Sequence, residues 1–218
     1  MPQTVLMGPR NTLLAGLARQ LGHPRGLPGR AVGRLLNSAN RGRVTAAVEA
    51  LSVRRGETAL DIGFGGGLGL DLLLRATNGG TVHGVELSAT MLASARRAFP
   101  ANIAAGRLVL HEGTMTALPL PDASVTAAIT VNTVYFVSDV AAAFSEIARV
   151  LAPGGRFVLG IGDPAAMAKA PFTDHTFRLR PVEDLEHALA TAGLDVRRHD
   201  RIGEGLAAFH LLVTELPG

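Results

Sequence analysis

The chain has 218 residues, 47% of them hydrophobic, with a formal net charge of +3 and no cysteine. This length and hydrophobic content predict one large folded domain, and the lack of cysteine excludes disulfides, thiolate metal sites and a cysteine nucleophile. No apolar run reaches the roughly 18 residues of a membrane span, and the N-terminus lacks the continuous apolar region of a signal peptide, so we expect a cytoplasmic protein.

The first 55 residues are strongly basic, with nine arginines and a single acid, Glu49. A basic segment on an otherwise acidic chain indicates an anionic substrate, a membrane surface or nucleic acid. The alternative is a general use of arginine in place of lysine, because Lys169 is the only lysine. We expect residues 1–55 to form an N-terminal helical arm or lid on a domain that spans residues 56–218.

From residue 56 onward, short apolar runs alternate with helical patterns, which is typical of a parallel α/β sheet. Ser88 is the expected N-cap of a helix that Pro100 stops, and Pro153–Gly155 is expected to end a later helix. The expected strands are residues 58–62, 81–85, 107–110, 125–131, 156–161, 194–201 and 206–214, the last two as an antiparallel pair. The expected helices are residues 68–76, 88–99, 138–151 and 181–193.

The segment Asp61-Ile62-Gly63-Phe64-Gly65-Gly66-Gly67 carries the strongest chemical signal. A strand that ends in an acid, followed by alternating glycines and a helix, lets the backbone pass close to a ligand. We therefore expect a nucleotide-like cofactor across the carboxyl ends of the first strands. A turn that only packs a helix on a strand is the alternative. The pattern G-x-G-x-x-G and a Walker lysine are both absent, which disfavours dinucleotides and phosphate cradling.

Glu86 ends the second expected strand, 19 residues after Gly67. A carboxylate at this position can accept hydrogen bonds from both hydroxyls of a ribose. The alternative is a charge at the start of the helix that Ser88 caps.

Four segments taken together resemble class I S-adenosylmethionine (SAM) dependent methyltransferases, in particular the group similar to the ubiquinone and menaquinone C-methyltransferases. They are Leu60–Gly67, Gly84–Ser88, Leu118–Ser124 and Arg149–Arg156. The resemblance implies an α/β fold: a Rossmann-like seven-stranded sheet of order 3-2-1-4-5-7-6, with the last strand antiparallel and helices on both faces.

The resemblance also implies SAM as the cofactor and assigns residues to it. The acid and glycines of the loop would face the methionine end, Glu86 the ribose and Leu87 the adenine. Thr114 and Met115 stand where similar proteins often carry Asp-Ala, and they would offer a hydroxyl and a backbone N–H to the adenine edge. The expected cofactor-binding residues are Asp61, Gly63, Gly65, Gly67, Glu86, Leu87, Thr114, Met115 and Asn132.

Two residues are candidates for a catalytic part. Tyr135 lies in the segment that borders the transferred methyl group in this fold, and its ring either faces the substrate or belongs to the core. His175 lies in the expected loop 162–180 and is either a general base or an exposed loop histidine. The histidines show no metal-ligand spacing, so we expect no metal, and His83 and His210 are expected to be structural.

These observations predict a SAM-dependent methyltransferase acting on a small molecule, either a lipid or quinone-like acceptor or a secondary metabolite. A nucleic-acid or protein methyltransferase using the basic arm is disfavoured by the low aromatic content of 4%. A SAM-binding protein without methyl transfer is the remaining alternative. The sequence leaves peripheral membrane contact and the oligomeric state open.

Overall fold

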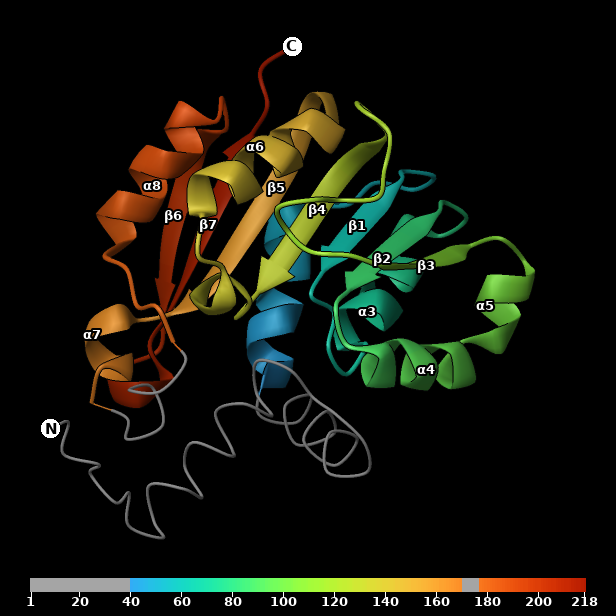
Figure 1. Cartoon of the computed structure of the whole chain (residues 1–218), viewed down its shortest axis with the longest axis horizontal. Helices are drawn as coiled ribbons and strands as arrows, with labels where there is room; N and C mark the ends of the chain where they lie inside the picture. Colours follow the sequence, from blue (N-terminus) through green and yellow to red (C-terminus); the bar gives the residue numbers. More distant parts are fainter. Residues whose placement is uncertain (1–39, 170–176) are drawn as a thin grey trace, which may run out of the picture.

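The structure is a computed structural model that describes residues 40–169 and 177–218. The prediction of an arm over residues 1–39 and the prediction for His175 lie outside these residues. The described chain forms one seven-stranded sheet of order β3-β2-β1-β4-β5-β7-β6, as predicted (Figure 1). Its strands are β1 Ala59–Ile62, β2 Val82–Glu86, β3 Leu108–Glu112, β4 Val125–Val131, β5 Leu151–Gly162, β6 Asp195–Ile202 and β7 Phe209–Glu215.

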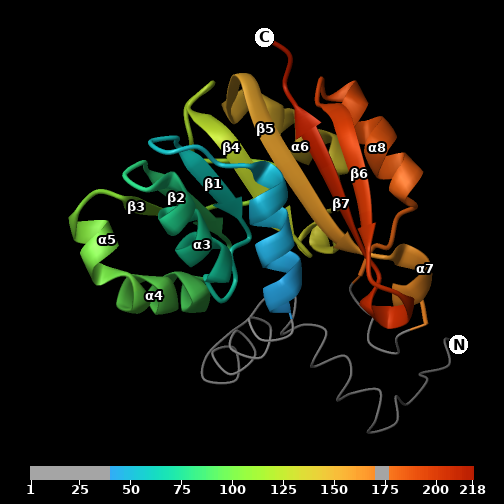
Figure 2. The same ribbon diagram turned by 180° about the vertical axis from the view of Figure 1, so that it is seen from behind.

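Helices cover both faces of the sheet (Figures 1 and 2). Buried residues of the helix of residues 40–51, of α3 (Leu68–Thr77) and of α4 (Ala89–Ala98) form the core on one face. Those of α6 (Val140–Val150) and α8 (Val182–Thr191) form the core on the other. The remaining helical segments are short: α5 Pro100–Ala104, α7 Pro164–Met167, and the 3-10 turns η1 Val134–Phe136 and η2 Gly205–Ala207.

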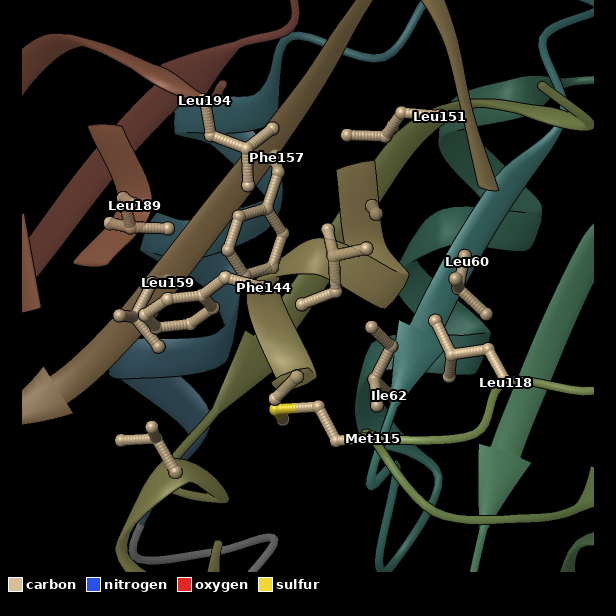
Figure 3. Close-up of a cluster of buried hydrophobic side chains, with 14 of the residues drawn as sticks. Leu60, Ile62, Met115, Leu118, Phe144, Leu151, Phe157, Leu159, Leu189 and Leu194 are labelled. Atoms are coloured by element: carbon tan, nitrogen blue, oxygen red, sulfur yellow. The ribbon is translucent and has the colours of Figure 1, made fainter. Parts of the chain in front are cut away.

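The core under α6 and α8 is filled by large apolar side chains from several helices and strands (Figure 3). Phe144 of α6 and Phe157 of β5 are fully buried, with ring centroids 6.5 Å apart. Met115 and Leu118, from the connection after β3, belong to the same cluster as Ile62 of β1, so an irregular segment also contributes to this core.

The helix of residues 40–51 belongs to the opposite core. Ala47 and Leu51 are fully buried there and pack with residues of β1 and α3. Its last carbonyl, that of Leu51, accepts a hydrogen bond of 3.1 Å from Nε of Arg156, which also pairs with Glu57 at 2.6 Å. This part of the expected arm is therefore tied to the body of the domain, while the division at residue 55 stays a prediction.

The last strand, β7, lies between β5 and β6 and is antiparallel to both. Phe209 at its start packs against Gly160 of β5, where an added Cβ would come 2.9 Å from the phenyl ring. Among the described strands, β6 pairs with β7 alone, so β7 joins β6 to the rest of the sheet.

Several element boundaries differ from the prediction. Pro100 begins α5 as well as following α4, because proline fits the first turn of a helix. The helix expected over 138–151 is α6, capped by Asp139 and ended at Val150, because Leu151 already pairs with Val125 in the sheet. Pro153–Gly155 consequently lies within β5, and the strand expected from residue 206 begins only after η2. The Ser88 cap and the bounds of β4 are confirmed.

Candidate active site

The glycine loop leaves β1 and enters α3 through left-handed backbone conformations. Gly63, Gly65 and Gly67 have φ of +71°, +49° and +83°, and Gly67 is the N-cap residue of α3. A Cβ on Gly63 would lie 2.6 Å from the hydroxyl oxygen of Thr133, just after β4. Only glycine therefore combines this backbone turn with such close packing of the β1 and β4 ends.

Asp61 places a buried carboxylate beside this loop, with 5% of the residue exposed. Burial, together with the nearby charge of Glu86, raises the pKa of Asp61 to about 8. A side chain on Gly69 of α3 would collide with this carboxylate, so the acid lies between β1 and the first turn of α3. Within residues 40–169 and 177–218 no hydrogen bond to the Asp61 carboxylate is present. An unpaired buried acid is costly, and a ligand that brings a cation repays the cost.

Glu86 connects the glycine loop to the start of α4. Its Oε2 accepts a hydrogen bond of 2.9 Å from the backbone N–H of Gly65, and its Oε1 accepts one of 2.9 Å from that of Ser88. Each carboxylate oxygen has a further lone pair for a ligand hydroxyl. Next to it, Leu87 is 43% exposed, which is unusual for a large apolar side chain in this molecule.

The segment expected at the adenine edge follows β3. The backbone N–H of Gly113 donates to the carbonyl of Glu86 at 3.3 Å, which brings this segment to the end of β2. The hydroxyls of Thr114 and Thr116 lie 3.2 Å apart, whereas the Met115 side chain is buried in the core. Met115 is therefore left with its backbone groups for any contact with a ligand.

Tyr135 is buried, with 3% of the residue exposed, and its ring packs 5.4 Å from that of Phe177. Its hydroxyl accepts a hydrogen bond from the Gly162 N–H at 2.5 Å and donates to Asn132 Oδ1 at 3.2 Å. Burial raises the pKa of the phenol well above its usual range. This burial agrees with the core alternative. A part for Tyr135 in catalysis stays a prediction.

The structure also brings together residues whose contacts with each other the sequence did not predict. Asn132 at the end of β4 donates to Asn40 of the helix of residues 40–51, and Arg43 of that helix donates to the same Asn40 oxygen. A second group links His199 and His210 across β6 and β7 at 2.8 Å, with Glu186 and Asp163 at its two ends. His210 is thus structural as predicted, and so is His83, whose Nδ1 lies 3.0 Å from Nε2 of His111. No local sequence motif predicts these contacts, because the residues that form them are far apart along the chain.

Residues 40–169 and 177–218 lack both a membrane-spanning helix and a metal-binding cluster. Within them, no helix is both long and apolar enough to cross a membrane. The same residues contain no group of three or more histidines and acids arranged to hold a metal ion.

Comparison with known proteins identifies relatives of this domain. Residues 60–159 match the family model described as a methyltransferase domain. A probable SAM-dependent methyltransferase of Mycolicibacterium smegmatis is 32% identical over 71% of this chain and 56% of its own length. A demethylmenaquinone methyltransferase of Tropheryma whipplei is 36% identical over 52% of this chain and 45% of its own. The chain thus spans about half the length of these curated relatives.

Among solved structures, a putative methyltransferase from Haloferax volcanii, in complex with the Trm112 methyltransferase activator, has a similar fold. Its TM-score is 0.76 at 20% identity, over 94% of this chain and 98% of that one. The sheet order and the strand, glycine loop and helix are those of α/β domains that bind a nucleotide-like cofactor at the carboxyl ends of their strands. The matched family model and the relatives identify a methyltransferase domain in residues 60–159, similar to the class I SAM-dependent methyltransferases, whose methyl donor is SAM.

Proposed function

We propose that this protein transfers the methyl group of SAM to a small-molecule acceptor at the carboxyl ends of β1 and β4. The observation that carries the proposal is the buried Asp61 carboxylate beside the left-handed glycine loop. A cationic ligand group is the natural partner for such a carboxylate, and the methionine end of SAM carries an ammonium group.

We propose a contact for each part of SAM. Asp61 would hold the ammonium, and the backbone at Gly63, Gly65 and Gly67 would lie along the methionine end. Glu86 would accept from the ribose hydroxyls while it keeps the loop in place. The exposed Leu87 would cover the adenine, with Thr114 and the Met115 backbone at its edge and Asn132 near the sulfur.

When bound, SAM supplies a methyl group activated by a sulfonium, and the protein's task is to align the acceptor and exclude water. A dedicated base is needed only for an acceptor that keeps a proton on its attacking atom. Transfer to an acceptor without such a proton therefore requires no acid–base pair among the residues that we assign to SAM. Tyr135 and the undescribed His175 stay candidates for the acceptor side.

For the acceptor we favour a lipid or quinone-like molecule, then a secondary metabolite. The similarity to a demethylmenaquinone methyltransferase supports this order. Nucleic acid is disfavoured because stacking aromatics are scarce. We further propose that residues 56–218 form the catalytic domain, to which the helix of residues 40–51 adds part of the core.

Titration calorimetry with S-adenosylhomocysteine (SAH) tests the cofactor, with NAD and ATP as controls. We expect binding of SAH alone, and equal binding of NAD would overturn the proposal. SAM labelled on its methyl group, incubated with separate pools of quinols and lipids, small metabolites, RNA and proteins, tests the acceptor. Label in a small-molecule pool is expected. Label in RNA or protein alone, or SAH binding without any transfer, would contradict the proposed reaction.

A further inference from the structure

A chain of hydrogen bonds joins β5 to the N-terminal helix across the end of β4. The Gly162 N–H donates to the Tyr135 hydroxyl at 2.5 Å, and that hydroxyl donates to Asn132 Oδ1 at 3.2 Å. The Asn132 Nδ2 then donates to Asn40 Oδ1 at 3.1 Å. From the other side, Nη1 of Arg43 reaches the same Asn40 oxygen at 3.4 Å.

The donor and acceptor of every hydrogen bond in this series are fixed by the groups at its two ends, Gly162 and Arg43. A backbone N–H can only donate, so the Tyr135 hydroxyl accepts from Gly162 and turns its own proton to Asn132. The Asn132 amide must then present its oxygen to Tyr135 and its nitrogen to Asn40. A guanidinium also only donates, so Arg43 requires an oxygen at Asn40 as well. Both ends thus assign Asn40 the part of an acceptor.

The backbone at Asn132 is left-handed. Its φ is +58°, a conformation that most L-residues avoid and that asparagine tolerates best after glycine. The next residue, Thr133, packs against Gly63 of the glycine loop and places its hydroxyl 3.5 Å from the Ile62 carbonyl. A change in the backbone at Asn132 would therefore move Thr133, which packs against the glycine loop.

We propose that Asn40 is a positioning residue: by accepting from Asn132, it holds the left-handed turn after β4 against the glycine loop and so shapes the methyl-transfer site. The inference deepens the proposed function and rests on it for the identity of the site. Asn40 acts through Asn132 and without contact to the cofactor. The N-terminal helix is consequently part of the site's architecture at its first turn, as well as of the core at Ala47 and Leu51.

Because Asn40 and Asn132 have fixed donor and acceptor parts, substitutions at the two residues can test the proposal. Asn40→Asp keeps the acceptor oxygen, whereas Asn40→Ala removes it. Asn132→Asp places an oxygen opposite the Asn40 oxygen and breaks the bond from the other side. Gly42→Ala, on the same turn, is the matched control, because no atom of the described residues outside its own helix lies within 4 Å of the added methyl.

Hydrogen–deuterium exchange of residues 130–137 in the ligand-free protein and titration with SAH are the two readouts. One neutral hydrogen bond corresponds to about a 2- to 10-fold change, so Asn40→Ala should speed exchange and weaken SAH binding by that factor. Asn132→Asp should do at least as much. Asn40→Asp and Gly42→Ala should match the wild type in both readouts.

Two results would overturn the inference. Unchanged exchange in Asn40→Ala would mean that the turn does not depend on Asn40. SAH binding as weak in Asn40→Asp as in Asn40→Ala, with wild-type exchange, would mean that Asn40 contacts the ligand directly. If the wild type itself fails to bind SAH, the proposed function fails, and the exchange of the ligand-free variants still decides whether Asn40 holds the turn.

Discussion

The two halves of the sheet are organised in different ways at their carboxyl ends. In the half formed by β3, β2 and β1, backbone geometry dominates: left-handed glycines follow β1, and Glu86 accepts from two backbone N–H groups. In the half formed by β4, β5, β7 and β6, side-chain networks dominate. One joins Tyr135, Asn132 and Asn40, and the other joins Asp163 to Glu186 through His210 and His199.

We relate this difference to two tasks: binding a cofactor that many proteins share, and binding an acceptor that differs between them. A backbone surface that accommodates a fixed cofactor needs glycines and one or two acids at set spacings. Side-chain networks around an acceptor side can be built from many residue types, so they differ from one protein to the next. We therefore expect substitutions in the first half to change SAH affinity directly. In the second half, substitutions in the Tyr135–Asn132–Asn40 network should change it modestly through the neighbouring glycine loop, and the remaining substitutions should change stability or acceptor turnover.

The largest effect is expected for Asp61. In the ligand-free protein its pKa of about 8 lies far above the unfolded value of 3.8, so the unfolded chain binds fewer protons between these limits. The free energy of unfolding should then fall by up to about 1.4 kcal/mol per pH unit as pH rises from about 4 to 8. Asp61→Asn should remove this decline and abolish SAH binding. Chemical denaturation across that pH range measures it, with the more exposed Asp71→Asn as the control; a decline that persists in Asp61→Asn would contradict the assignment.

Gly63→Ala is expected to have the next largest effect on stability and SAH affinity. The left-handed backbone and the contact with Thr133 together should cost about 2–4 kcal/mol of unfolding free energy and most of the SAH affinity. Gly56→Ala has a similar φ of +81° with nothing near the added methyl, so it should show the backbone cost alone. Equal losses in the two variants, measured by urea denaturation, would show that the packing of the two strand ends does not matter.

Glu86→Ala removes a charged acceptor from two backbone N–H groups. The proposed hydrogen bonds from the two ribose hydroxyls would be lost as well, and each bond to a charged group is worth about 1.5–3 kcal/mol, so SAH affinity should fall at least tenfold while circular dichroism stays unchanged. Glu86→Gln keeps one acceptor oxygen, so its SAH affinity should lie between those of the wild type and Glu86→Ala. SAH affinity within twofold of the wild type in Glu86→Ala would reduce this residue to a charge at the start of α4.

The smallest effect is expected for His199→Gln, in the half of the sheet formed by β4, β5, β7 and β6. His199→Gln interrupts the bonds to His210 and Glu186 on a partly exposed edge strand, which should cost about 0.5–1.5 kcal/mol of stability. SAH affinity should not change, because no residue of this network belongs to the glycine half. Thermal unfolding and calorimetry on the same sample test both statements, and a clear loss of SAH affinity would break the division between the halves.

Sequence reasoning succeeded where residues close in the chain decide the structure. The strand order, the Ser88 cap and the acid–glycine loop all follow from spacing over a few residues or from family resemblance. It failed where partners are distant: Asn132 lies 92 positions from Asn40, and His210 lies 47 from Asp163. The burial of Tyr135 depends on Gly162 and Phe177, which no periodicity places beside it.

The place of β7 has a consequence for synthesis of the protein. The strand made last, Phe209–Glu215, is inserted between two strands made earlier, so the sheet cannot close until these residues leave the ribosome. Until then β5 presents an open, strongly apolar edge, and β6 has no partner among the described strands. A chain interrupted just before Phe209 would carry an intact glycine loop together with two unpaired strand edges, and it should aggregate rather than accumulate as a shortened enzyme.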